Sequence, residues 1–108
     1  MSIRTQLLKG VLEGCILAVI DGESVYGYVL SQRLQEAGLN EVSEGTIYPV
    51  LLRLQKNGLI VGEMRPSTSG PDRKYYEITQ QGKEALNEIR EQWQLLNVPI
   101  TTLLGGKS

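Results

Sequence analysis

The feature that most constrains the fold is a segment, residues 43–60, with a helix start, two unlike faces and a helix stop. Ser43 can accept a hydrogen bond from an unpaired amide of the first turn, so it is expected to cap the helix. Apolar residues at helical spacing predict one face that packs on a core: Ile47, Val50, Leu51 and Leu54. Asn57-Gly58 predicts the end of the helix, and an extended apolar run begins directly after it.

The opposite face of this helix is small, hydroxyl-bearing and basic. It carries Gly45, Thr46, Tyr48, Pro49, Arg53 and Lys56. Small and hydroxyl side chains near a helix N-terminus allow close approach to a phosphate backbone or to the floor of a groove. Pro49 removes one backbone hydrogen bond and is expected to bend the helix locally.

Helical periodicity predicts two further helices before this segment. The first runs from about Ile3 to Ile20 and carries a wide apolar stripe. The second begins after Ser24 as its cap and covers residues 25 to 36 or 37. Gly38 ends it, so the second helix and the segment after Ser43 form a helix-turn-helix element.

Two strands, residues 59–65 and 74–78, are predicted after Gly58, and turn-forming residues 66–72 join them. A two-stranded hairpin is marginal alone, so it must lean on the helices, which gives a winged arrangement. Gly70 lies at the tip of the wing, and Arg73 and Lys74 lie at its base. Such cations suit contacts to phosphates, although a solvated turn with ordinary surface cations has the same composition.

A last helix, capped by Thr79, is predicted to run to about Asn97, where Val98-Pro99 should end or kink it. Its apolar residues form a heptad-like seam of Leu86, Ile89, Trp93 and Leu96. A chain of 108 residues has no obvious internal use for both this seam and the stripe of the first helix, which includes Leu8 and Leu12. A homodimer that buries both surfaces is therefore expected.

Net charge argues at first against a nucleic-acid partner, because the formal charge is only −1. The distribution matters more than the sum. Between residues 53 and 74 the basic side chains outnumber the acidic ones: Arg53, Lys56, Arg65, Arg73 and Lys74 against Glu63 and Asp72. A local positive strip is expected on an otherwise acidic body.

The chain lacks the parts of an enzyme active site. It has no histidine and one cysteine, and it contains neither a P-loop nor a dinucleotide-binding glycine pattern, so no catalytic residue, metal or cofactor is expected. Cys15 is interpreted as a buried inert thiol, with a redox sensor as the alternative. The apolar run of the first helix is too short to span a bilayer, and a single cysteine suits a reducing cytosol, so we expect a cytoplasmic protein without a membrane partner.

Three sequence blocks resemble the PadR family of bacterial transcriptional regulators, which are winged helix-turn-helix proteins. The blocks are Tyr26-Gly27, then Glu44-Gly45-Thr46-Ile47-Tyr48-Pro49 with Arg53-Leu54 and Gly58-Leu59-Ile60, then Gly70-Pro71-Asp72-Arg73-Lys74-Tyr75-Tyr76 with Ile78-Thr79 and Gly82. The resemblance as a whole covers roughly residues 5 to 96. The short C-terminal region resembles the smaller of the family's two architectures. The expected fold is mainly α with a two-stranded β wing: a winged helix-turn-helix over residues 1–78, then a dimerisation helix and tail over residues 79–108.

The resemblance implies a homodimeric repressor that binds a pseudo-palindromic operator in double-stranded DNA and is released by a small aromatic or amphipathic effector. The implied DNA-binding residues are Ser43, Gly45, Thr46, Tyr48, Pro49, Arg53, Lys56, Gly70, Arg73 and Lys74. Thr46, Tyr48 and Arg53 would lie closest to DNA. Trp93 is either a packing anchor of the dimer or a platform for the effector. Two alternatives remain open: a winged-helix module for protein–protein assembly, and a ligand-binding dimer without a DNA function.

Overall fold

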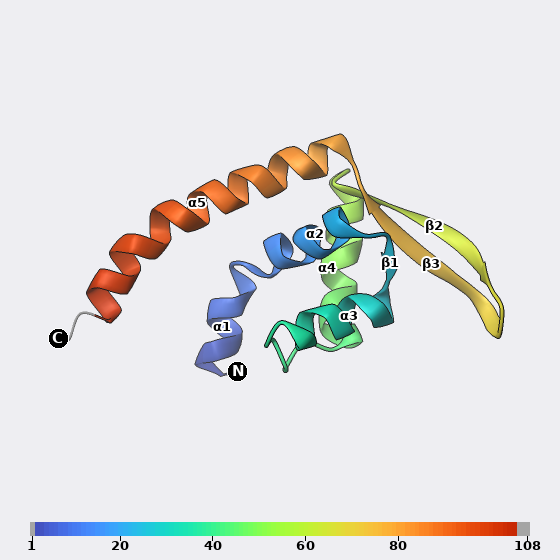
Figure 1. The fold of residues 1–108 in the computed structure, drawn as a ribbon, viewed down its shortest axis with the longest axis horizontal. Helices are drawn as coiled ribbons and strands as arrows, with labels where there is room; N and C mark the ends of the chain where they lie inside the picture. The colour runs from blue at the N-terminus through green and yellow to red at the C-terminus, as the bar shows by residue number, and fades with distance from the viewer. Residues whose placement is uncertain (1, 106–108) are drawn as a thin grey trace.

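A computed structural model describes residues 2–105 of the chain (Figure 1). Its elements are α1 (Ile3–Lys9), α2 (Leu12–Gly22), β1 (Val25–Tyr26), α3 (Gly27–Glu36), α4 (Glu44–Lys56), β2 (Ile60–Ser67), β3 (Gly70–Ile78) and α5 (Gln80–Leu104). The first four helices form the body of the molecule. The wing, which is the β2–β3 hairpin, projects from one side, and α5 passes over the body and extends away on the other side (Figure 1). The molecule is consequently elongated, with extents of 55 × 28 × 21 Å.

The core is built around α2, which contacts α3, β3 and α5. Helical periodicity in four helices supplies most of its side chains, and the sheet and the α3–α4 connection complete it. Its buried members are Leu12, Ile16, Leu17, Ile20, Val25, Leu30, Leu34, Val42, Ile47, Val50, Leu51, Leu54, Ile60, Tyr76 and Leu86. Full burial of one such aliphatic side chain contributes about 1.5–3 kcal/mol, so this single cluster stabilises the whole arrangement.

The prediction of one helix over residues 3–20 is wrong, because the chain breaks at Gly10 and Val11 into α1 and α2. Glycine is a poor helix residue, and here α1 closes with two hydrogen bonds: the Gly10 amide donates to the Leu7 carbonyl at 3.3 Å and the Val11 amide to the Leu8 carbonyl at 3.0 Å. None of the residues of α1 is buried. Instead, Arg4 holds α1 against the α3–α4 connection through Glu41 and the Gly38 carbonyl.

The predicted start of the second helix is also wrong. Val25 and Tyr26 form β1, which pairs antiparallel with Tyr76 and Tyr75 of β3, so the sheet has three strands in the order β1-β3-β2. Valine and tyrosine favour the extended conformation, and burial of Val25 decides the outcome. Ser24 does not cap α3, whose N-cap is Tyr26, and within residues 2–105 the buried Ser24 hydroxyl has no hydrogen-bond partner.

The wing is longer than predicted. β2 continues to Ser67 and β3 begins at Gly70, so only two residues connect the paired positions. The sequence predicts both Pro66 and Pro71 in the loop, but both lie within strands. The register is irregular between Arg65 and Ser67, and such an irregularity accommodates a proline that cannot donate to the ladder.

Of the two outcomes predicted at Val98-Pro99, an end or a kink of the last helix, the end does not occur, since α5 continues through Pro99 to Leu104. Its predicted cap is confirmed: the Thr79 hydroxyl accepts from the Gly82 amide at 3.0 Å and donates to the Gly58 carbonyl at 2.7 Å. Gly82 lies so close to the α4–β2 turn that a Cβ there would be 2.0 Å from the Leu59 carbonyl oxygen. These contacts fix the direction in which α5 leaves the wing. None of the helices in the described residues is both long and apolar enough to cross a membrane.

Candidate nucleic-acid interface

α4 has the start and the stop that its sequence predicts. The Ser43 hydroxyl accepts a hydrogen bond from the Thr46 amide at 3.3 Å. Asn57 is the C-cap, and Gly58 follows with φ +77°, a backbone conformation that residues other than glycine rarely adopt. The Leu59 amide then donates to the Leu54 carbonyl, which closes the helix and aims the chain into β2.

The two faces of α4 are also as predicted, with one addition. Ile47, Val50, Leu51 and Leu54 are buried. The outer face of α4, as we call the opposite surface, consists of exposed residues: Gly45, Thr46, Tyr48, Pro49, Leu52, Arg53 and Lys56. The sequence interpretation missed Leu52, because a leucine beside Leu51 is easily assigned to the core. A rotation of 100° per residue, which places Leu52 beside Pro49 and Lys56, would have found it.

A hollow of about 240 Å³ separates α4 from the part of the hairpin next to β1. This part, residues 73–76 of β3 and their partners in β2, is called the base of the wing. The hollow brings together residues that lie far apart in the sequence: Tyr26, Gly27, Glu44, Ile47, Tyr48, Leu51, Arg73, Lys74 and Tyr76. Three residues expected to bind DNA, Tyr48, Arg73 and Lys74, therefore share one surface. Gly70 is exposed at the tip of the wing, where a Cβ would meet no other atom within 4 Å.

Arg73 has a defined position at this surface because Tyr26 holds it. The guanidinium carbon lies 4.6 Å from the centre of the Tyr26 ring, and Nη1 donates a hydrogen bond to the Tyr26 hydroxyl. Tyr26 in turn packs edge-on against Tyr75 of β3, with ring centres 5.2 Å apart. Pairing of β1 with β3 places these rings side by side, so the short strand that the sequence did not predict is what anchors the cation.

Lys74 is positioned by packing. Its aliphatic chain crosses Gly62 of β2, where a Cβ would lie 2.3 Å from the lysine Cε, and its ammonium lies 5.8 Å from the Tyr76 ring centre. Burial raises the pKa of the Tyr76 hydroxyl, and the neighbouring Tyr48 adds to the effect.

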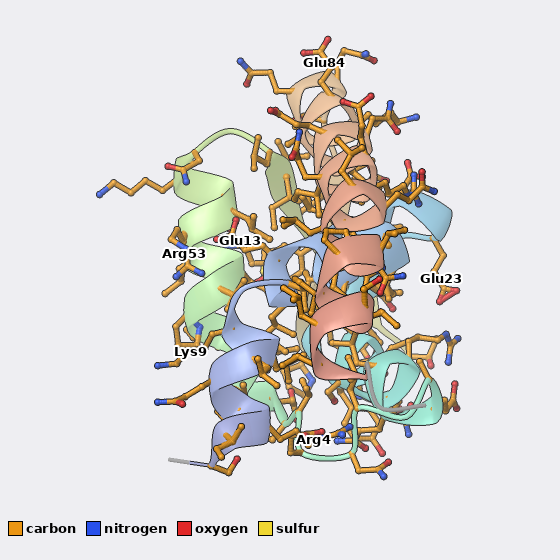
Figure 2. All side chains as sticks on the ribbon, turned by 90° about the vertical axis from the view of Figure 1, so that its left-hand side faces the viewer. Arg4, Lys9, Glu13, Glu23, Arg53 and Glu84 are labelled. Carbon is orange, nitrogen blue, oxygen red and sulfur yellow. The ribbon has the colours of Figure 1, made fainter. Side chains whose placement is uncertain are left out.

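The expected positive strip is not continuous. Arg53 donates from Nε to Glu13 of α2 at 3.1 Å, and Figure 2 shows Arg53 on the flank of α4 nearest Glu13. Arg65 contacts Glu63 and Glu77, and these contacts, led by the hydrogen bond from Arg65 to Glu63, raise its pKa. Lys56, Arg73 and Lys74 make no ion pair with any residue between 2 and 105. Among the five basic residues of the expected strip, those available to a polyanion thus lie at the end of α4 and at the base of the wing.

The residues expected at a dimer interface divide into three groups by burial. Leu12 and Leu86 are buried in the chain's own core, so a partner would reach little of their surface. Leu8 and Ile89 are partly buried against that core. Gly14 permits this packing of α2 on α5, since a Cβ there would lie 2.6 Å from Cγ2 of Ile89. Trp93 and Leu96 are 51% and 53% exposed and lie on the part of α5 that extends beyond the body.

An apolar groove of about 330 Å³ lies between α2 and α5. Its lining residues are Val11, Gly14, Cys15, Ala18, Leu86, Ile89, Arg90 and Trp93. Cys15 is half-buried rather than buried as predicted, and burial raises the pKa of its thiol, which lowers the thiolate fraction near neutral pH. Trp93 is the one aromatic residue of this lining, and Arg90 is the one charged residue.

Comparison with known proteins identifies close relatives. A family model described as "Transcriptional regulator PadR-like family" matches residues 16–88. The crystal structure of a PadR-like transcriptional regulator from Bacillus cereus is 52% identical, covering 94% of this chain and 99% of that chain with a TM-score of 0.84. A Streptococcus transcriptional regulator is 48% identical, with 91% and 96% covered and a TM-score of 0.81. The transcriptional regulator Rv3488 from Mycobacterium tuberculosis is 40% identical over 84 residues, which are 78% of this chain and 74% of that protein.

Proposed function

Because the chain belongs to the PadR-like family of transcriptional regulators, we propose that it is a cytoplasmic, homodimeric repressor that binds a pseudo-palindromic operator. In this proposal α4 enters the major groove, and the base of the wing contacts the adjacent phosphates. A small aromatic effector releases the repressor from DNA.

The observation that carries the proposal is the shared surface of α4 and the wing. Tyr48, Arg73 and Lys74 line one hollow although the helix and the returning strand are separated in sequence. Arg73 is held in place by Tyr26, and Lys74 by packing on Gly62. Cations that are fixed before binding lose little conformational entropy when they contact phosphate.

Arg53 is expected from the sequence to be among the residues closest to DNA, and its contact with Glu13 suggests a more limited role. An exposed ion pair contributes only about 0–1 kcal/mol, so DNA phosphates can compete for this guanidinium. We therefore assign Arg53 to phosphate rather than to a base edge. Lys56 lies one turn from Leu52 at the end of the outer face. Its ammonium group carries a positive charge, so Lys56 is also assigned to phosphate.

The dimer is proposed from the exposed end of α5. After Trp93 and Leu96, the predicted seam continues with Ile100 and Leu103 at the same spacing. All four of these apolar side chains are exposed. With α5 continuous through Pro99, this seam is longer than the sequence suggested. A second copy of the chain that packs along it would bury Trp93 and place two copies of α4 on one duplex.

The effector is proposed to lie in the groove between α2 and α5, against Trp93. The lining is apolar with one charged neighbour, Arg90, so a planar aromatic compound that is neutral or anionic suits it best. Calorimetry with candidate aromatic compounds on the wild type and on Trp93→Leu tests this assignment. Loss of heat in the variant, with an unchanged fold, is expected; equal binding by both proteins would make Trp93 a packing residue only.

The DNA-binding function is tested with a fragment of the protein's own promoter region. Fluorescence anisotropy should show that this fragment binds more tightly than unrelated duplex of equal length, by a factor of about 10³ or more. Stoichiometric titration should give two chains per site. The same weak affinity for both duplexes would favour the alternatives, a protein–protein module or a ligand-binding dimer.

A further inference from the structure

We infer that Leu52 recognises a thymine in the major groove by contact with the C5 methyl group of the base. The inference rests on the proposed DNA-binding function and adds a residue that determines sequence specificity.

Leu52 lies near the middle of the outer face of α4. Each helical residue advances 100°, so Leu52 falls between Tyr48 and Pro49 on the preceding turn and Lys56 on the following turn. The side chain is 48% exposed, whereas the adjacent Leu51 is 1% exposed. Leu52 therefore contributes to the outer surface, and the core is complete without it.

A single exposed leucine is ordinary on a protein surface, so exposure alone would mean little. What distinguishes Leu52 is its surroundings. Together with the exposed Tyr48 and Pro49 it forms a small apolar patch, and cations border this patch. Arg53 and Lys56 lie beside it on α4, while Arg73 and Lys74 approach from the wing across the hollow that Tyr48 lines.

An apolar patch with a cationic border complements the major groove of DNA. The walls of the groove carry phosphates, and its floor carries base edges with hydrogen-bonding groups and one apolar group, the thymine methyl. A leucine side chain has no donor or acceptor, so it cannot pair with the amino, carbonyl or ring-nitrogen groups of the other base edges. A base whose amino group faced Leu52 would lose a hydrogen bond to water, which adds discrimination against cytosine and adenine.

The test removes the methyl group from the DNA and the side chain from the protein. Selection from a pool of random duplexes gives the preferred site, and each thymine in it is then replaced by deoxyuridine, one symmetric pair at a time. For the wild type, the replacement at one pair of positions should weaken binding about fourfold for each half-site, or about 15-fold for a dimer. Replacement at the other positions should have smaller effects.

Leu52→Ala identifies the protein side of this contact. The variant should bind the thymine and the deoxyuridine duplexes equally at the sensitive position, because the interacting side chain is gone. Leu52→Met retains an apolar side chain and should restore part of the difference. Circular dichroism should show an unchanged fold for both variants, since the side chain lies outside the core.

Two results would overturn the inference while the proposed function stands. The wild type could discriminate its operator from unrelated DNA and yet tolerate every deoxyuridine replacement. Alternatively, Leu52→Ala could keep the full penalty at the sensitive position, which would assign the methyl contact to a neighbour such as Tyr48. Failure of the wild type to select any sequence would contradict the proposed function itself, and the inference with it.

Discussion

Contacts between residues far apart in the sequence position the cations of the proposed interface. The ion pairs of Arg53 with Glu13 and of Arg65 with Glu77 join distant positions, so no local pattern reveals them. Tyr26 is similar: its contact with Arg73 depends on strand pairing between segments nearly fifty residues apart.

Tyr26→Phe tests whether the tyrosine hydroxyl positions Arg73 for DNA. The variant keeps the ring below the guanidinium but removes the hydrogen-bond acceptor. We expect DNA affinity to fall about fivefold for each half-site, or about 30-fold for a dimer, equivalent to the roughly 1 kcal/mol of one hydrogen bond in each subunit, while the salt dependence stays that of the wild type because no charge is removed. A flatter salt dependence in Tyr26→Phe would show that Arg73 had left the interface altogether.

Cys15 provides a prediction about pH. Its pKa is raised by burial, so the native state favours the neutral thiol. A group of this kind contributes stability that is fully present below the unfolded pKa and is lost as pH rises through the folded pKa. The free energy of unfolding of the wild type relative to Cys15→Ser should therefore decline above about pH 8.5, the ordinary thiol value.

Urea unfolding of the two proteins between pH 7 and 10 measures this difference. Alkylation of Cys15 by iodoacetamide in the native protein should also be slower than in the urea-unfolded chain at the same pH. An alkylation rate in the native state equal to or above that of the unfolded chain would contradict the assignment of an inert thiol.

At the scale of elements, the sequence predicted the types of the longer segments and missed several boundaries. Hydrophobic periodicity sufficed for the helices, because most of them bury one face on the common core. Three errors concern boundaries: the break at Gly10, where glycine is a poor helix residue; the pairing of Val25 and Tyr26 with β3, which depends on a distant segment; and the continuation of α5 through Pro99. The third error also shortened the predicted seam of α5.

Neighbouring residues on different faces of α5 test the role of the seam. Leu96 and Leu95 are 53% and 63% exposed, but only Leu96 lies on the seam. Leu96→Lys should place an unpaired charge in the interface and dissociate the dimer, whereas Leu95→Lys should leave it intact. Sedimentation at micromolar concentration measures both; equal behaviour of the two variants would argue against the seam as the interface.

Leu86→Lys is expected to behave differently from both. Its side chain is 2% exposed within a single chain, so a buried ammonium there costs on the order of several kcal/mol and should unfold the protein. The thermal transition of Leu86→Lys should disappear or move to a much lower temperature, while Leu96→Lys should remain folded. A folded Leu86→Lys monomer would show that α5 is independent of the core.

At the scale of the whole molecule, charge is organised by position. The formal charge of −1 does not show that the cations of this region fall into two sets. Arg53 and Arg65 form ion pairs with acidic residues, whereas the cations at the wing base and at the end of α4 form none with residues 2–105. The winged fold and the family were predictable from three motif blocks, because each block corresponds to a local element in a fixed order. The hollow between α4 and the wing was not, since it depends on how the sheet packs on the helices.

The central claim is that the wing base and the outer face of α4 contact duplex DNA. The most direct measurement is the salt dependence of promoter-fragment binding by the wild type, Arg73→Ala, Lys74→Ala and a control, Lys83→Ala, an exposed cation on α5 outside the proposed interface. Each wing variant should lower the slope of log affinity against log salt by about two units for a dimer, because each removes one cation from a phosphate in both half-sites, and Lys83→Ala should leave the slope unchanged. Slopes that are equal in all four proteins would contradict the account.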